Sequence, residues 1–159
     1  MGAQRDRSGL NRRAREDSLI AAALRILERR LHRDGPILAT PAGVREYLRL
    51  QIATKDHEVF VVLFLDAQNR FIACEEVFRG TLTQTSVYPR EVVKAALKHN
   101  AAAVVFAHNH PSGAAEPSIQ DQALTRTLAD ALALVDVKAI DHFIVVGTGA
   151  VSFAERGLM

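Results

Sequence analysis

At 159 residues, with 48% hydrophobic and 24% charged residues, the chain has the composition of one soluble globular domain that can bury a core. A net charge of only +2 gives no overall sign of polyanion binding, and no apolar run approaches the roughly eighteen residues of a membrane span. The first residues lack the apolar core of a signal peptide, and Cys74 has no second cysteine with which to form a disulfide. We therefore expect a cytoplasmic protein in which Cys74 serves in packing.

Positive charge is concentrated at the start of the chain. Residues 1–35 hold nine arginines and five acids (net +4), whereas the remainder holds eleven basic and thirteen acidic residues (net −2). Residues 1–17 are polar and are expected to be frayed, with Ser18 capping a helix over residues 19–32. This Arg-rich arm, residues 1–35, is interpreted either as an amphipathic helix that packs on the domain or on a partner, or as a basic segment that contacts DNA.

The rest of the chain, residues 36–159, mixes strands and helices around one predicted sheet. Thr40 and Pro41 open a helix to about residue 53, because proline is tolerated at the first helical position. The apolar run 58–66 predicts a central strand that turns into a second strand. That second strand is predicted over 71–78, further strands over 101–107, 138–146 and 151–153, and helices over 89–100 and 118–135.

The most informative stretch begins where the strand over 101–107 ends. His108 and His110 are two residues apart, so an extended chain presents both imidazoles on one side. After a turn, Ser118 starts a helix and Asp121 lies in its first turn. Two imidazoles and a carboxylate leave the fourth position of a tetrahedral zinc ion open for water, as a catalytic site requires.

The order His-x-His-Pro, six residues, Ser, two residues, Asp resembles the JAMM motif of MPN-domain metalloproteases. More narrowly, residues 58–66, 80–113, 116–121 and 141–147 resemble the RadC family. The resemblance implies an α/β fold of the MPN type, in which a curved mixed β-sheet is flanked by helices. RadC-like chains often carry an N-terminal helix-hairpin-helix domain, which we expect a chain of this length to lack.

The expected metal ligands are His108, His110 and Asp121. Two competing explanations are histidines satisfied by backbone groups at a strand end, and an Asp121 that serves only in a capping box with Ser118. Ser118 is expected to cap its helix and, as the resemblance implies, to direct its hydroxyl at the developing oxyanion. Asn109 stands where MPN proteases usually carry Ser or Thr. It is expected to point away from the metal, so that this departure has little effect.

Hydrolysis also requires a general base. Glu58 opens the first apolar strand at the place that corresponds to the family's upstream glutamate, and it is expected to accept a proton from the metal-activated water. Glu75 and Glu76 on the next strand are its rivals, and one of them should face inward because neighbours alternate faces. His142 is expected to be a core or supporting histidine, since a fourth protein ligand would close the site. His99 shows no such pattern and is expected at the surface.

We predict a zinc-dependent hydrolase of the JAMM type that cleaves a peptide or isopeptide bond. The traditional label of the RadC family implies one alternative, a DNA-associated protein that acts in repair or recombination, although fold does not fix substrate. A metal-binding interaction scaffold without turnover is the other alternative. The expected partners are a peptide or protein substrate and, through the Arg-rich arm, DNA; no membrane partner is expected.

Overall fold

The computed structural model describes the backbone of residues 4–33, 40–80 and 87–159, and the side chains of residues 11–29, 40–80 and 87–159. Helices and strands follow in the order α1, α2, β1, β2, α3, β3, α4, β4, β5. The elements are α1 (Gln4–Arg33), α2 (Pro41–Ile52), β1 (Glu58–Leu65), β2 (Phe71–Gly80), α3 (Pro89–Lys98), β3 (Ala103–Asn109), α4 (Ile119–Ala133), β4 (Lys138–Val146) and β5 (Gly149–Ser152).

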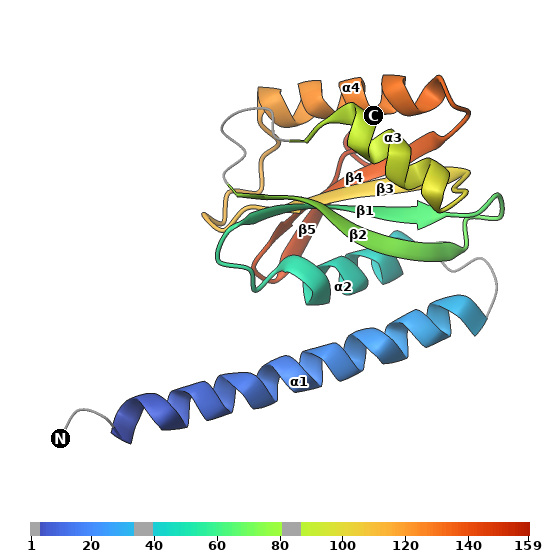
Figure 1. Cartoon of the computed structure of the whole chain (residues 1–159). Coiled ribbons are helices and arrows are strands. Elements are labelled where there is room, and N and C mark those ends of the chain that lie inside the picture. The colour runs from blue at the N-terminus through green and yellow to red at the C-terminus, as the bar shows by residue number, and fades with distance from the viewer. Residues whose placement is uncertain (1–3, 34–39, 81–86) are drawn as a thin grey trace.

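The strands form one mixed sheet in the order β2-β1-β3-β4-β5. β1 pairs antiparallel with both β2 and β3, whereas β3 and β4 run parallel. Parallel neighbours need a crossover connection, which α4 provides. Figure 1 shows α3 and α4 on one face of the sheet and α1 and α2 on the other, so the predicted α/β architecture of a mixed sheet flanked by helices is confirmed.

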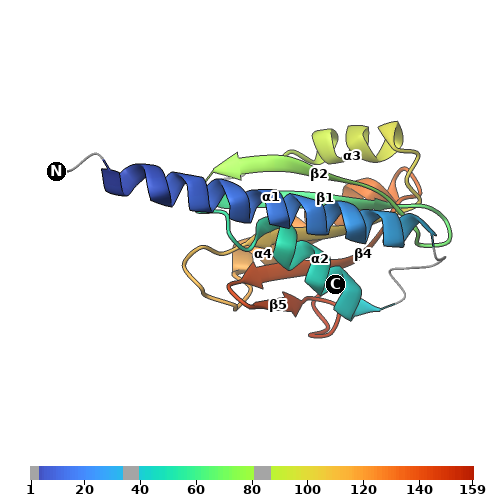
Figure 2. The ribbon, with the colours of Figure 1, turned by 90° about the horizontal axis from the view of Figure 1, so that it is seen from below.

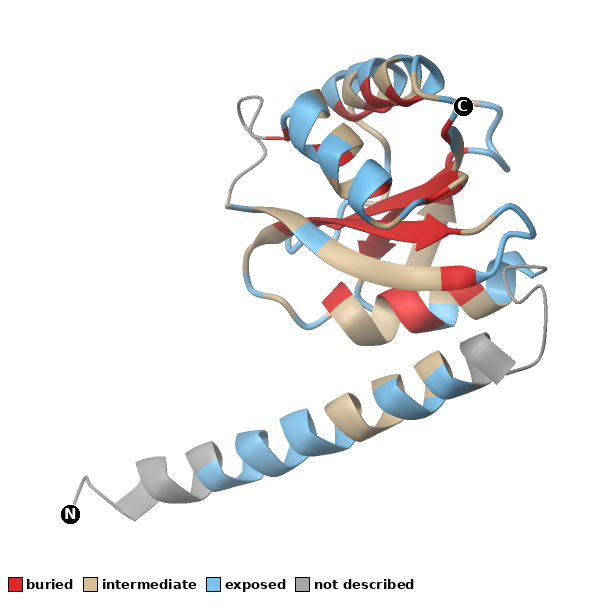
Figure 3. Cartoon of the chain, turned by 45° about the vertical axis from the view of Figure 1, so that its right-hand side comes forward, coloured by how far each residue is buried: buried red, intermediate tan, exposed pale blue. Residues whose placement is uncertain are grey.

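Each face of the sheet has its own core, because successive residues of a strand point to opposite faces. Residues 60, 62 and 64 of β1 join the core beneath α3 and α4, whereas residues 59, 61, 63 and 65 join the core beneath α2. In β3, Phe106 faces α3 and α4 and Ala107 faces α2. Figure 3 shows the central strands as the most deeply buried part of the chain.

The first helix differs from the prediction. α1 begins at Gln4, so the backbone over residues 4–17 is helical rather than frayed, and Ser18 lies inside the helix instead of capping it. Arginine, alanine and glutamate are good helix formers, and the Arg12–Glu16 pair at 2.9 Å adds an i,i+4 contact. Residues 11–19 are exposed, and the start of α1 extends past the sheet in Figures 1 and 2.

The second half of α1 packs on the domain. Its Leu24 and Leu27 lie against the core beneath α2, which also takes up Cys74. Burial raises the pKa of the Cys74 thiol to about 12, in keeping with the predicted packing role. None of the helices that the structure describes is both long enough and apolar enough to cross a membrane.

Candidate metal centre

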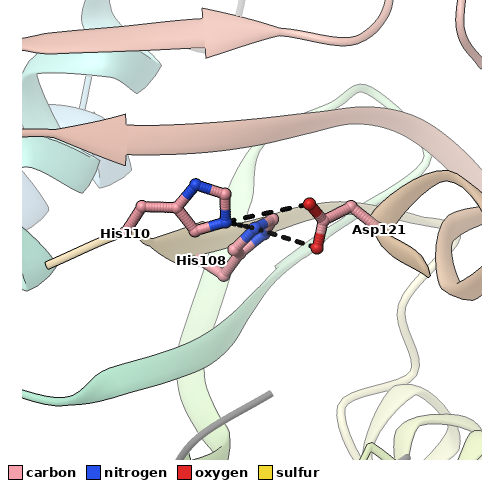
Figure 4. Close-up of side chains that lie close together, drawn as sticks. All are labelled: His108, His110 and Asp121. Atoms are coloured by element: carbon pink, nitrogen blue, oxygen red, sulfur yellow. Dashed lines mark hydrogen bonds and ion pairs between the residues drawn. The ribbon is translucent and has the colours of Figure 1, made fainter. Parts of the chain in front are cut away.

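The centre lies where β3 ends beside the first turn of α4. His108 is on the same side of β3 as Phe106, and the β1–β3 register sets it opposite Phe60, whose ring stacks on it at 6.1 Å between centroids. Asp121 reaches the same point from α4. The ring atom His108 Nε2 lies 2.9 Å from His110 Nε2 and 3.3 Å from Asp121 Oδ1 (Figure 4). The three predicted ligands therefore converge from two elements that are adjacent in sequence.

Asp121 also belongs to the capping box of α4. Its Oδ2 accepts hydrogen bonds from the backbone N–H and the hydroxyl of Ser118, at 2.8 and 2.7 Å, while its own N–H donates to Ser118 Oγ at 3.0 Å. These bonds engage Oδ2 and leave Oδ1 directed at His108, while His110 Nε2 lies 3.7 Å from Oδ2. The two explanations of Asp121, cap and ligand, are thus compatible, because each can use a different carboxylate oxygen.

Electrostatics keep this carboxylate charged. Burial opposes the ionisation of Asp121, but the adjacent imidazole of His108, followed by the hydrogen bonds from Ser118, outweighs it and holds the pKa of Asp121 well below its usual range. A buried anion next to two imidazoles attracts a cation. The site is therefore electrostatically suited to a metal ion.

Each histidine directs its other ring nitrogen at a protein group. His110 Nδ1 lies 2.6 Å from the carbonyl oxygen of Ala114, so this nitrogen carries a proton and Nε2 presents a lone pair. His108 Nδ1 lies 2.8 Å from His142 Nε2. His142 is fully buried on β4, and burial, followed by the nearby His108, lowers its pKa well below the usual range. His142 thus lies behind the predicted ligand His108, where a supporting histidine was expected.

The donor set fits a divalent metal. Among the described residues, His108, His110 and Asp121 are the group of histidine, cysteine and acidic side chains whose ligand atoms all lie within 4.8 Å of one another. Tetrahedral zinc with bonds of about 2.05 Å would set two ligand atoms about 3.3 Å apart. The 2.9 and 3.3 Å separations from His108 Nε2 need little adjustment to reach that value.

Glu58 lies beside this site in the strand register and is not a member of the cluster. It is the first residue of β1, half-buried, and shares a strand face with Phe60, which covers His108. In the β1–β3 register Phe60 pairs with His108, so a two-residue extension of the register sets Glu58 opposite His110. At this position Glu58 could act as a general base, whereas the register does not make it a metal ligand.

Asn109 has a role that the sequence did not reveal. It points away from the ligands, as predicted, and is 2% exposed. Its Oδ1 accepts from the Val59 N–H at 2.8 Å, and its Nδ2 donates to the carbonyl oxygens of His57 at 3.0 Å and Lys55 at 3.4 Å. The amide therefore binds the backbone on both sides of Glu58. The prediction concerned the metal site alone and did not include these bonds of Asn109 to the backbone of β1 and the residues before it.

The rival glutamates lie elsewhere. Glu75 pairs with Val62, four positions along β1 from Glu58, which is about 13 Å at 3.3 Å per residue. Its carboxylate binds Lys98 Nζ at 2.9 Å and His99 Nε2 at 2.6 Å. His99, expected at the surface, is therefore largely buried in this cluster, with 18% of its side chain exposed. Glu76, on the other face of β2, pairs with Arg79 at 2.8 Å.

Comparison with known proteins places the fold and the motif in one family. The family model of the RadC-like JAB domain matches residues 38–158. The chain belongs to the RadC family. Relatives of this RadC-family chain include the "UPF0758 protein" of Thiobacillus denitrificans, 59% identical over 143 residues, which is 88% of this chain and 64% of the relative. The corresponding protein of Nitrosomonas eutropha is 64% identical over 127 residues, or 80% of this chain and 57% of the relative.

A third relative, the "UPF0758 protein" of Polaromonas sp., is 58% identical over 151 residues, 95% of this chain and 67% of its own length. The RadC-family chain thus spans between 57% and 67% of the length of these three relatives. Their names state a family and no activity. The identity establishes the RadC-like JAB domain, and the chemistry has to be argued from the site.

Proposed function

We propose that this RadC-family domain is a zinc-dependent hydrolase of the JAMM type that cleaves a peptide or isopeptide bond. His108, His110 and Asp121 would hold the metal. The observation that carries the proposal is the convergence of their ligand atoms within 4.8 Å, with a second atom of each residue already engaged by the protein. A zinc ion held this way would lower the pKa of a water molecule toward 7 and polarise a substrate carbonyl.

Glu58 is the proposed general base. Its place at the start of β1, opposite His110 by register, lets a carboxylate receive a proton beside the ligand cluster and return it to the leaving group. Asn109 holds the backbone on either side of this residue. Asn109 lies between His108 and His110 in sequence and bonds to both neighbours of Glu58. One buried side chain thus fixes the proposed base relative to two proposed ligands.

Ser118 contributes first to the ligand set. Its hydroxyl donates to Asp121 Oδ2 at 2.7 Å and so holds that carboxylate in place. A hydroxyl has one proton, so the proposed oxyanion role requires this O–H to turn from Asp121 to the substrate during the reaction. The hydrogen bond from Ser118 to Asp121 therefore favours a role for Ser118 in orienting Asp121 before substrate binds.

The test is an unbiased peptide-library cleavage assay with zinc-loaded protein, repeated with Glu58→Gln. This change keeps the size of the side chain and removes the proton acceptor, so cleavage should fall by roughly 10²–10⁴-fold with zinc content unchanged. Glu75→Gln and Glu76→Gln are matched controls that should keep full activity. Loss of cleavage in one of the controls, with Glu58→Gln active, would move the base to β2. Activity in all three variants would rule out a carboxylate base.

The same assay separates turnover from binding alone. A domain that retains zinc through His108 and Asp121 but cleaves no member of the library, alone or with added metal, would favour the metal-binding scaffold. The register position of Glu58, opposite His110, favours turnover, because it is compatible with a general base beside the cluster.

A second proposal concerns DNA and rests on α1. Arg12, Arg13 and Arg15 lie in the stretch 11–19, whose residues are all exposed, and this part of α1 extends past the sheet (Figures 1 and 2). Arginines on a solvent-facing helix can neutralise backbone phosphates of DNA. The Arg-rich arm would then bring the domain to DNA, as the association of the family with repair suggests.

A further inference from the structure

A buried chain of polar contacts runs from His108 to α4 behind the metal ligands. His108 Nδ1 lies 2.8 Å from His142 Nε2, and His142 Nδ1 lies 2.6 Å from Thr125 Oγ1. Thr125 Oγ1 in turn lies 2.6 Å from the backbone carbonyl oxygen of Asp121. His108, His142 and Thr125 are at most 1% exposed. The contacts therefore have to satisfy one another.

The direction of each hydrogen bond follows from the last acceptor. A carbonyl oxygen only accepts, so at 2.6 Å the Thr125 hydroxyl must donate to Asp121 O. With its single proton used there, Thr125 Oγ1 must accept from His142 Nδ1–H. An imidazole that carries its one proton on Nδ1 has a lone pair on Nε2, so His142 Nε2 accepts from His108 Nδ1–H. His108 Nε2 is left with a lone pair that faces His110 and Asp121.

We propose that Thr125 and His142 are positioning residues that fix the tautomer of His108, so that Nε2 is kept free of a proton for the metal. This inference rests on the metal site of the proposed function and adds two residues to it. Histidine ligands of metals commonly donate their second N–H to a protein acceptor, which sets the orientation and the basicity of the ring. Here the acceptor is another histidine, whose own state is set by a threonine.

We call this chain of hydrogen bonds, from His108 through His142 and Thr125 to the carbonyl of Asp121, the relay. The relay also links both His108 and Asp121 to α4. Asp121 and Thr125 are four residues apart on α4, so both side chains lie on one face of the helix. The carboxylate of Asp121 meets His108 Nε2, and Thr125 acts on the opposite side of the same ring through His142. The position of α4 thus sets the third ligand and the tautomer of the first together.

Three aromatic rings surround His142 and offer no hydrogen-bond acceptor that could replace the Thr125 hydroxyl. Phe60, Phe106 and Phe153 lie 5.3, 5.8 and 4.6 Å from its ring, measured between centroids. Without the Thr125 hydroxyl, His142 Nδ1–H would face an apolar surface, and its proton would be better placed on Nε2, where His108 Nδ1 can accept it. His108 would then carry its own proton on Nε2, the atom that the metal requires.

The decisive substitution is Thr125→Val, which removes the hydroxyl and keeps the shape of the side chain. Zinc affinity, measured by competition with a chromophoric chelator, should fall by roughly 10–100-fold. Thr125→Ser restores a hydroxyl and should bind zinc like the wild type. Thr127→Val is the matched control, because Thr127 makes the same bond to the carbonyl four residues earlier, Ala123 O at 3.0 Å, on the exposed side of α4.

A second measurement reads the tautomers without metal. Long-range ¹H–¹⁵N spectra of histidine-labelled, metal-free protein should show protons on Nδ1 of His108 and of His142 in the wild type, and a proton on His108 Nε2 in Thr125→Val. A wild-type His142 with its proton on Nε2 would overturn the relay, whether or not Thr125→Val folds. So would a Thr125→Val protein that binds zinc within threefold of the wild type. A wild type that binds no zinc but shows the expected tautomers would refute the metal proposal and leave the relay standing.

Discussion

Replacing Asn109 by alanine tests the link between the two strands that carry the base and the ligands. The substitution removes the acceptor of the buried Val59 N–H and the donor that serves His57 O at 3.0 Å. An unsatisfied buried N–H costs about 1–3 kcal/mol. Residues 55 and 57 are only half-buried, so water can replace the lost donor to their carbonyl oxygens, and we expect a total loss of about 2–3 kcal/mol. For a domain of this size that corresponds to a melting temperature lower by about 4–12 °C.

The assay is thermal and urea unfolding of metal-free protein, with hydrogen exchange of the Val59 amide as a local readout. Asn11→Ala is the matched control, because Asn11 is exposed on α1 and its loss should change stability by no more than about 0.5 kcal/mol. Asn109→Asp keeps the acceptor for Val59 but sets a carboxylate oxygen against the His57 carbonyl, so it should destabilise more than alanine. If Asn109→Ala were as stable as Asn11→Ala, with the Val59 amide still protected, the proposed stabilisation of β1 by the Asn109 hydrogen bonds would be refuted.

Two further predictions concern the rival carboxylate and the arm. Hydrogen bonds from Lys98, and then from His99, hold the pKa of Glu75 below its usual range. Ionised Glu75 therefore stabilises the fold at pH values above its unfolded pKa of about 4.3. This stabilisation is lost as the pH falls through the folded pKa. Glu75→Gln should therefore lower stability at pH 7 and make stability fall less steeply on acidification, measured by urea unfolding at each pH. An unchanged slope in Glu75→Gln would contradict this. If the Arg-rich arm binds DNA, affinity should fall steeply with salt and deletion of residues 1–17 should weaken it. Binding that is absent at low salt, or indifferent to the deletion, would leave α1 as a packing element.

Local patterns in the sequence were sufficient for most of the fold. Continuous apolar runs predicted β1 and β3, and Pro41 and Pro89 marked the starts of α2 and α3, because these signals act within a few residues. The first half of α1 was missed, since an exposed helix made of arginine and other polar residues has no apolar face to reveal its period.

The same division holds for the site. The convergence of His108, His110 and Asp121 could be predicted because their spacing encodes a strand end followed by a helix start. The roles of Asn109 and Thr125 could not, because their partners come from other strands: Val59 is fifty residues from Asn109, and His142 is seventeen from Thr125. One local signal was available for Thr125, which lies one helical turn after Asp121 and therefore on the same face of α4.

The central claim is that His108, His110 and Asp121 hold one metal ion. It is tested most directly by metal analysis of protein purified without chelator, comparing the wild type with His108→Ala and Asp121→Ala. His99→Ala is the control, because His99 is a partly buried histidine that pairs with Glu75 outside the cluster. The wild type and His99→Ala should each carry about one zinc per chain, and the two ligand variants should lose most of it. Unchanged zinc in both ligand variants would contradict the assignment of the site.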